Sequence, residues 1–463
     1  MGEKNNRRGN RITAQQRRRS MSCAKIYALS QVIGFTCVGT NTLSLVAIKL
    51  GAGEVVLGLL SMMMISTLVF RVFTMSAVEK YGKKHVIILW QGIAIVCCVP
   101  FLIIPFVAEK WAKEVTLGIL LVTVFARVAT ASMGNTGWFP FLQDIVPRRI
   151  TGRFFASLRM TWQTANLITL LAISWFLGKD AAWWKFEVVF VVAILAYTVR
   201  IISMIPTTEN PPKGKDAVTP KLRERFGEIF SNRKLLGLTG FVTSYWIAAT
   251  MATPFKIKYL KNLDYGDGFI IAATAMISAG AVVSLWAWGK LADRFGNRSL
   301  LGLCHLGLPV VTGLWVLVGP QSHIFVLALF LGWSVFNSGA GIAMIRLLMH
   351  NIPQEKQNQI NVINVIGNFF MGLAPLAAGV FISSLDGVDI RLGVTDMGHY
   401  HVFFLVSAAL FAVPYFASMA VRNERESSTR EMMVVVTRPL LSMVGPVVKI
   451  NGRKPFEKDS KRS

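Results

Sequence analysis

Charged residues are scarce in this chain. Only 16% of its 463 residues are charged, whereas a soluble globular domain averages about 25%. In their place, 53% of the residues are hydrophobic. Apolar runs of about 20 residues, the length needed to cross a bilayer, recur along the whole chain. The composition therefore predicts a protein that lies in a membrane.

The motifs of nucleotide-driven and metal-dependent chemistry are also missing. The sequence contains no Gly-Lys-Ser/Thr loop that would cradle phosphates, and no His or Cys group with metal-ligand spacing. Its five cysteines lie mostly inside apolar runs, where they serve as small apolar residues. We therefore predict no catalytic residue, no metal site and no cofactor, and we interpret the protein as something other than an enzyme.

Twelve apolar segments have the length of a membrane span, and they predict an all-α bundle. Their approximate bounds are 24–48, 54–78, 85–107, 115–142, 154–178, 186–206, 235–258, 268–288, 299–319, 323–349, 358–384 and 400–421. One long polar segment divides them into six and six. The predicted organisation is a basic arm (1–23), a first half (24–206), a linker (207–234), a second half (235–421) and a basic tail (422–463).

The basic residues are distributed unevenly. If the N-terminus is cytoplasmic, most of the 49 Lys and Arg residues lie on the cytoplasmic side, chiefly in the arm, the linker and the tail. This asymmetry predicts that both termini are cytoplasmic. The net charge of +25 is then a coat that faces the anionic lipids of the inner leaflet, and not a nucleic-acid site. We expect a plasma membrane, and specifically a bacterial inner membrane.

A charged hairpin of form G-x-L-A-D-R-x-G-x-R joins the eighth and ninth spans, over residues 289–298. Gly296 permits the positive φ of a tight reversal. Asp293 lies at the mouth of a span, where a carboxylate is costly unless it is paired. The other charged and glycine positions of the hairpin are Gly289, Arg294 and Arg298.

The hairpin after the second span is a degraded copy of this one. It carries Glu79 and Gly82 in place of Asp293 and Gly296, and Met75 where the first glycine belongs. The two copies indicate that the halves are repeats.

The hairpin at 289–298 closely resembles the signature loop of major facilitator superfamily transporters, and the resemblance extends over roughly residues 24–421. It implies twelve helices in two six-helix pseudo-repeats, alternating access to a site between the halves, and a monomer. It also implies that the hairpin acid pairs with neighbouring helices and locks one face shut. In this family spans 1, 4, 7 and 10 line the cavity, which makes Asn41 a candidate binding residue.

Polar residues inside the spans are the candidates for solute contact. Arg127 lies near the middle of the fourth span, where a charge is expected to face a water-filled cavity or a partner. The alternative is a structural cation that holds this span to a neighbour. Arg346, near the end of the tenth span, is explained either by snorkelling or by a part in the gate.

Two polar rows have helical spacing. Asn361, Asn364 and Asn368 share one face of the eleventh span, and Arg159, Gln163 and Asn166 follow the same pattern in the fifth. The two rows are related by the repeat, so they either flank one cavity or form hydrogen bonds between helices.

No Asp or Glu lies in the middle of any predicted span, and an ordinary proton relay is therefore not evident. Arginines without carboxylates favour a neutral or anionic solute over a cation. We predict secondary or facilitated transport of such a solute. The alternative is a scaffold or sensor that keeps the transporter fold without transport.

Overall fold

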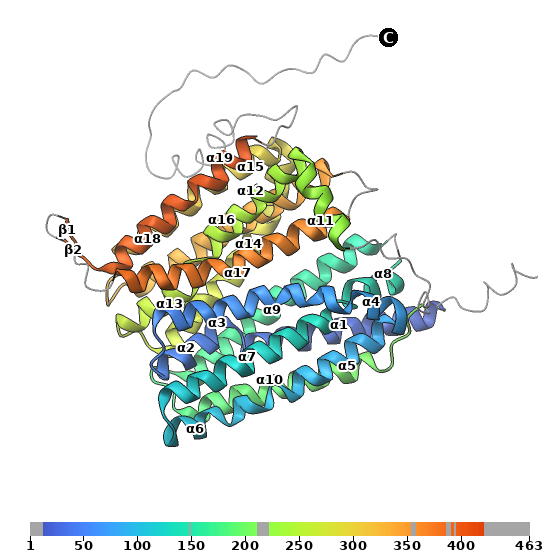
Figure 1. The fold of residues 1–463 in the computed structure, drawn as a ribbon, viewed down its shortest axis with the longest axis horizontal. Coiled ribbons are helices and arrows are strands. Elements are labelled where there is room, and N and C mark those ends of the chain that lie inside the picture. The colour runs from blue at the N-terminus through green and yellow to red at the C-terminus, as the bar shows by residue number, and fades with distance from the viewer. Residues whose placement is uncertain are drawn as a thin grey trace, which may run out of the picture.

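Long helices make up almost all of the structure. The computed structural model describes residues 13–147, 150–210, 222–352, 358–385, 390–392 and 395–420. Eleven helical stretches of these residues are long and apolar enough to cross a bilayer. Helix α9 (Thr151–Leu177) runs among them as a twelfth (Figure 1). The predicted all-α membrane bundle of twelve helices is confirmed.

The first half comprises the spans up to residue 204. Its elements are α1 (Ala14–Cys37), α2 (Thr40–Lys49), α3 (Glu54–Ser66), η1 (Thr67–Phe70), α4 (Arg71–Tyr81), α5 (Lys83–Val96), η2 (Val99–Leu102), α6 (Ile104–Lys110), α7 (Lys113–Asn135), α8 (Trp138–Ile145), α9 and α10 (Trp183–Met204).

The second half follows the short helix α11 (Leu222–Ser231). Its elements are α12 (Arg233–Thr250), α13 (Thr253–Asn262), α14 (Asp267–Phe295), α15 (Asn297–Gly313), η4 (Leu314–Leu317), α16 (His323–Asn351), α17 (Asn358–Ser384), α18 (His399–Leu410) and α19 (Ala412–Ala420). The short antiparallel strands β1 (Ile390–Leu392) and β2 (Thr395–Met397) lie between α17 and α18.

Two predicted boundaries differ from the structure. The basic arm was expected to reach residue 23, but α1 begins at Ala14, because Thr13 and Gln16 form a reciprocal capping box. Part of the predicted linker forms α11, and α12 begins at Arg233, inside the predicted linker. Residues 1–12, 211–221 and 421–463, which include the rest of the arm and linker and the tail, lie outside the described residues.

The two halves pack through two helix pairs. Helix α3 lies along α17, and α9 lies along α14. Glycines allow close approach in both pairs: a Cβ on Gly58 would lie 2.5 Å from the Pro375 carbonyl oxygen, and one on Gly268 would lie 2.5 Å from that of Ser174. Small residues at such contacts are typical of membrane helices, whose association depends on close van der Waals packing.

The two ends of the bundle differ in how their cores are built. We call the end that carries Glu54 the Glu54 end, and the opposite end, which carries both glycine hairpins, the Gly296 end. One buried apolar cluster includes residues of both halves, such as Leu57 and Phe255, and extends through the Glu54 end. At the Gly296 end, each half has a separate cluster. The halves are therefore joined at one end and separate at the other.

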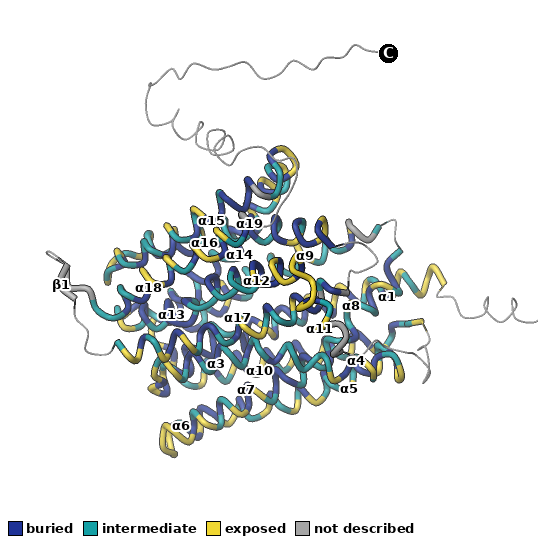
Figure 2. Tube along the Cα trace, turned by 45° about the horizontal axis from the view of Figure 1, so that its top comes forward, coloured by how far each residue is buried: buried dark blue, intermediate teal, exposed yellow. Residues whose placement is uncertain are grey.

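The outer surface of the bundle is apolar. Figure 2 shows exposed segments along the outward faces of the helices, and among them Trp175 is 87% exposed, Ile324 84% and Val283 75%. Apolar exposure of this extent is expected of helices that face lipid.

Candidate functional site

A cavity of about 520 Å³ lies between the two halves. It is lined by residues of α9, α12, α14, α16 and α17, namely Arg159, Gln163, Trp246, Ile277, Ala281, Ser334, Asn337, Ser338, Gly341, Met344, Ile345, Leu348, Met349, Ile360 and Asn364. A volume of this size accommodates a small organic molecule.

The cavity is open at the Gly296 end. Its lining follows α16 from Ser334 to Met349, a rise of about 22 Å at 1.5 Å per residue. Met349 is 65% exposed and Ile345 is 44% exposed. Arg159 and Asn364 are exposed as well, so water reaches the cavity from this end.

Three residues of the two polar rows line the cavity. Gln163 and Asn364 line the cavity from opposite halves, together with Arg159. The rows are therefore brought to one cavity, as one of the two alternatives requires. Spans 7 and 10 also contribute, through Trp246 and Ser334, whereas the described residues of spans 1 and 4 do not line this cavity.

Asn166 forms hydrogen bonds between helices, which is the second alternative for the polar rows. Its amide nitrogen lies 2.7 Å from Ser278 Oγ on α14, and its Oδ1 lies 2.6 Å from the Thr36 hydroxyl on α1. The bond to Ser278 crosses between the halves, and Ser278 is the residue after Ile277, which lines the cavity. Asn166 therefore joins helices in this conformation and does not face the cavity.

The other predicted binding residues lie away from the cavity. Asn41 on α2 and Asn368 on α17 are half-buried, and neither is a lining residue. Asn361 falls in α17, but its side chain lies outside the described residues.

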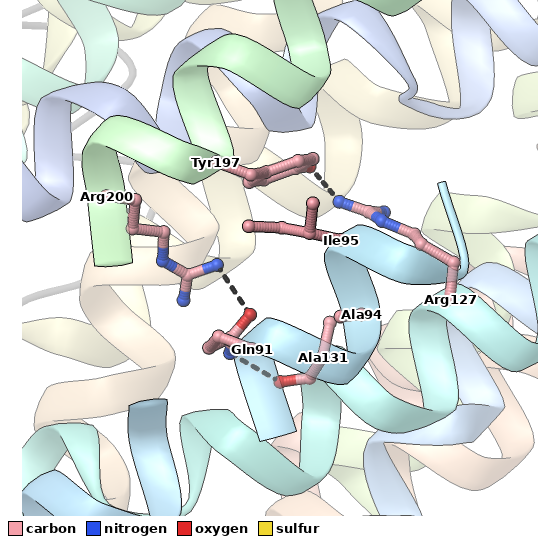
Figure 3. A pocket seen from close by; sticks show the side chains of 7 residues that line it. All are labelled: Gln91, Ala94, Ile95, Arg127, Ala131, Tyr197 and Arg200. Carbon is pink, nitrogen blue, oxygen red and sulfur yellow. Dashed lines mark hydrogen bonds between the residues drawn. The ribbon is translucent and has the colours of Figure 1, made fainter. Parts of the chain in front are cut away.

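Arg127 is buried in the first half, with 5% exposure, and it does not line the central cavity. Its guanidinium donates a hydrogen bond to the Tyr197 hydroxyl on α10 (Figure 3). Arg127 lies near the middle of the helical stretch Lys113–Ile145. In this conformation the contact matches the alternative of a structural cation.

Contacts between the halves close the Glu54 end. Lys258 on α13 forms an ion pair of 2.8 Å with Glu54, and the Tyr400 hydroxyl donates to the same carboxylate at 2.8 Å. Beside them, the Asp267 and Gly268 amides at the start of α14 donate to carbonyls of the loop after α9, at 2.8 and 2.6 Å. These contacts join helices of both halves, so the cavity is sealed on this side.

The second-half hairpin has the expected backbone. Gly296 has a φ of +86° between α14 and α15, and Asp293 forms an ion pair with Arg346 on α16. Arg346 therefore contacts the hairpin in this conformation. The Arg294 Cζ lies 5.2 Å from the centre of the Phe295 ring. A Cβ added at Gly289 would meet no atom within 4 Å. The Arg298 side chain lies outside the described residues.

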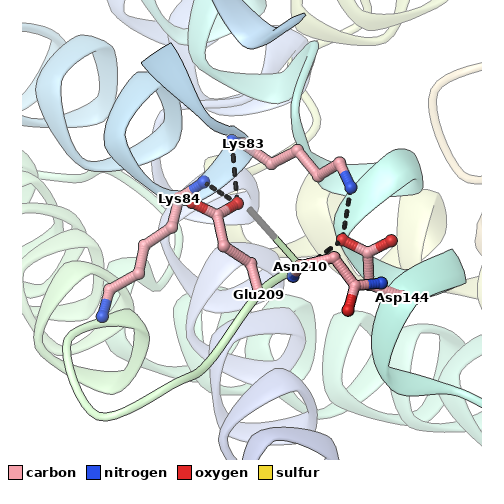
Figure 4. A network of polar contacts seen from close by, with 5 residues as sticks. All are labelled: Lys83, Lys84, Asp144, Glu209 and Asn210. Carbon is pink, nitrogen blue, oxygen red and sulfur yellow. Dashed lines mark hydrogen bonds and ion pairs between the residues drawn. The ribbon is translucent and has the colours of Figure 1, made fainter. Parts of the chain in front are cut away.

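The first-half hairpin has the same backbone and a different charge arrangement. Gly82 has φ +96° and ψ 157°, close to the +86° and 168° of Gly296, which supports the repeat. Glu79 forms no ion pair with a described residue. Instead, the Glu209 carboxylate accepts hydrogen bonds from the Lys83 and Lys84 backbone amides, at 2.8 and 2.9 Å (Figure 4).

The Glu209 carboxylate lies against the N-terminus of α5, where the helix dipole favours a negative charge. The Lys83 side chain pairs with Asp144 at the end of α8. The sequence interpretation missed Glu209. The available signal was an acidic residue just after the end of a predicted span.

Lys256 was also missed. The sequence places it near the end of the seventh span, but in the structure it is buried, with 6% exposure, on α13. Its Nζ lies 5.2 Å from the Trp315 ring centre and 5.3 Å from that of Trp333. Neither Lys256 nor Trp333 lines the cavity, although Trp333 precedes the lining residue Ser334 in α16. Among the described residues, no group of three or more His, Cys, Asp or Glu side chains is placed to hold a metal ion.

A family model described as Major Facilitator Superfamily matches residues 26–379. Comparison with curated proteins gives no match. Among solved structures, the chain is similar to a mutant form of the nucleoside transporter NupG, with TM-score 0.66 and 13% identity over 87% of this chain and 100% of that one. It is also similar to the inward-open xylose transporter XylE from E. coli, with TM-score 0.63 and 10% identity over 90% and 98% of the two chains.

A third similar structure is a bacterial homologue of the human lysosomal transporter Spinster, in an inward-facing and occupied conformation. The TM-score is 0.61 and the identity 12%, over 88% of this chain and 97% of that one. At identities this low, the likeness to all three structures shows the fold.

Proposed function

The chain belongs to the major facilitator superfamily, and we propose from this premise that it moves a small neutral or anionic solute across a membrane by alternating access. Family membership makes the protein a membrane transport protein and not an enzyme. The observation that carries the finer proposal is the cavity between the halves, which is open at the Gly296 end and sealed at the Glu54 end. A carrier needs this arrangement in one of its two states.

The Gly296 end is the cytoplasmic side in this proposal, so the structure represents an inward-open state. The positive-inside rule supports this orientation, because α1 begins and α19 ends at that end, and the basic arm and tail adjoin these two helices in the sequence. Two of the similar structures are in inward-facing or inward-open conformations. The protein would then lie in a bacterial inner membrane as a monomer, with the halves 24–206 and 235–421 rocking about the cavity and the linker 207–234 on the inside.

Arg159, Gln163 and Asn364 are the proposed solute contacts. Arg159 is the one charged side chain among the described residues that line the cavity, and a lone guanidinium attracts an anionic or hydrogen-bonding group and repels a cation. Gln163 and Asn364 line the same cavity from different halves, so a solute bound to both would respond to the relative movement of the halves. Trp246 supplies an apolar surface beside them.

The hairpins are the proposed gate elements. Asp293 with Arg346, and Glu209 with the start of α5, hold the two glycine turns in place at the open end. We propose that these turns approach each other when the cavity closes to the cytoplasm.

Solute flux in proteoliposomes tests the proposal. Purified protein is reconstituted and assayed for uptake and efflux of a panel of neutral, anionic and cationic solutes. Arg159→Gln should abolish flux of the transported solute, whereas Arg153→Gln, an exposed residue of the same helix outside the cavity, should not. If folded protein moves no solute of the panel, the scaffold or sensor alternative replaces transport.

A further inference from the structure

The lining of the central cavity changes in character with depth. Along α9, Arg159 lies about 12 Å and Gln163 about 18 Å from the Gly296 end of the helix. Trp246 on α12 and Asn337 on α16 each lie about 20 Å from the same end of their helices. We call Gln163, Trp246 and Asn337 the cavity floor. The one charged side chain among the described lining residues therefore lies nearer to the open mouth than the floor does.

Trp246 gives the floor an aromatic surface that its neighbours hold in place. The Tyr245 ring centre lies 5.4 Å from that of Trp246, edge-on at 68°. A Cβ on Gly367 would lie 3.8 Å from Trp246 Cδ1, so α17 packs against the same indole. Aromatic rings pair with one another in offset-stacked or edge-on arrangements. A fixed indole at the floor thus favours a planar ring over a flexible chain.

The amides of the floor supply hydrogen-bond donors beside this surface. The Tyr245 hydroxyl donates to Asn337 Oδ1 at 2.6 Å. This contact orients the amide, and Asn337 Nδ2 has no acceptor among the described residues. Gln163 likewise forms no hydrogen bond with another described side chain or backbone group. A few placed polar groups of this kind orient a ligand in a pocket, so a solute that fits the floor carries an uncharged oxygen acceptor on its ring.

The charge of the lining limits the charge of the solute. Arg159 is the one cation among the described lining residues, and no acidic side chain is among them. One guanidinium matches one carboxylate, which it binds with two parallel hydrogen bonds. A second anionic group would have no counter-charge. Eight of the fifteen lining residues are hydrophobic, so a solute that is polar on all sides would leave polar groups unpaired.

We propose that the solute is an aromatic monocarboxylate, with its ring and an uncharged oxygen acceptor against the floor and its carboxylate on Arg159. The carboxylate lies about 6–9 Å nearer to the mouth than the floor residues do, so the acceptor and the carboxylate occupy opposite ends of the solute. This inference rests on the proposed transport function and narrows it, because it selects one class among neutral and anionic solutes.

Four matched probes separate the effect of the ring from that of the charge. Uptake into proteoliposomes, corrected for leakage into protein-free liposomes, is measured for para-hydroxyphenylpropionate, its primary amide, its ring-saturated analogue para-hydroxycyclohexylpropionate, and tyramine. The aromatic acid should enter about tenfold or more faster than the amide and tyramine. It should enter about threefold or more faster than the ring-saturated acid. Equal uptake of the amide, or of the ring-saturated acid, overturns the inference and leaves the broader transport function standing.

Variants assign the two preferences to their residues. Arg159→Gln should lower uptake of the aromatic acid about tenfold or more and abolish its advantage over the amide. Trp246→Leu should abolish the advantage of the aromatic ring and retain the advantage of the charge. The controls are Arg153→Gln, which removes an exposed cation of α9, and Trp175→Leu, which removes an indole that is 87% exposed. Preferences that persist in both cavity variants overturn the inference.

Binding in detergent separates the class of ligand from the transport function. The melting temperature of the unaltered protein should rise saturably with para-hydroxyphenylpropionate, and at a higher concentration, or not at all, with the other three probes. A rise without flux of any solute refutes transport and supports the ligand class. Flux of other solutes, with neither uptake of the aromatic acid nor a rise, overturns the ligand class and supports transport.

Discussion

Removal of the Glu54 carboxylate should shift the protein toward the state that is open at the Glu54 end and closed at the Gly296 end. Glu54 accepts from Lys258 and from Tyr400, each at 2.8 Å, and both partners belong to the other half. The Glu54 and Lys258 side chains are only 15% and 14% exposed. Glu54→Ala therefore deletes two charge-assisted contacts that exist when the Glu54 end is closed and that separation of the halves would break.

The size of the effect follows from these contacts. A hydrogen bond to a charged group contributes about 1.5–3 kcal/mol. Lys258 lies near the end of α13 and can extend its ammonium toward water after the substitution, which reduces the loss. A net shift of about 2 kcal/mol is expected, which corresponds to a change of about 30-fold in the ratio of the two states.

Hydrogen–deuterium exchange resolves the shift at both ends of the bundle. In Glu54→Ala, amides near the start of α3 and in α13 should exchange faster, and amides at the Met349 end of α16 should exchange more slowly as the cavity closes there. Asp180→Asn is the matched control, because Asp180 is 82% exposed and lies 3.8 Å from Lys261 across the same interface, where an ion pair contributes little. Faster exchange at both ends would indicate local unfolding and refute the reasoning.

Three further substitutions test other parts of the structure. Asp293→Asn should slow solute exchange in proteoliposomes more than Glu79→Gln does, since only the first acid has an ion-pair partner among the described residues; equal effects would contradict this ranking. Gly58→Leu should lower the melting temperature by overpacking α3 against α17, at a cost of about 1–3 kcal/mol, whereas Gly237→Leu, where a Cβ meets no neighbouring atom within 4 Å, should change it little. Lys256→Met should raise the melting temperature, because cation–π contacts only partly offset the desolvation of a buried ammonium; a marked fall would show that the cation is stabilising.

The parts of the site that the sequence predicted are those with a local signal. Helical spacing placed Gln163 and Asn364 on faces that do meet one cavity, because side chains three and four residues apart share a helix face. The positive φ at Gly296 followed from a glycine in a short hairpin between two spans. The number of spans followed from the lengths of the apolar runs.

The residues that were misplaced depend on which way a helix is rotated. Arg127 lies near the middle of its helical stretch, but α7 is buried on several faces, so the sequence did not show that the side chain turns toward α10 and away from the other half. Asn166 shares a row with Gln163 and still lies beyond the cavity, because α9 contacts α14 closely at that level. Lys256 and Glu209 acquire their environments from segments distant in sequence.

The charged hairpins have a more limited role in this state than their resemblance implied. Asp293 and Arg346 both belong to the second half, and Lys83, Asp144 and Glu209 all belong to the first half or to the linker that leaves it. Among the described residues, the ion pairs that cross between the halves, those of Glu54 and Asp180, lie at the Glu54 end. The hairpin acids therefore hold each half together at the open end, whereas Glu54 holds the two halves to each other. Because the internal ion pairs can persist while each half moves as a unit, and the Glu54 contact cannot, the energetic cost of leaving this state lies mainly at the Glu54 end.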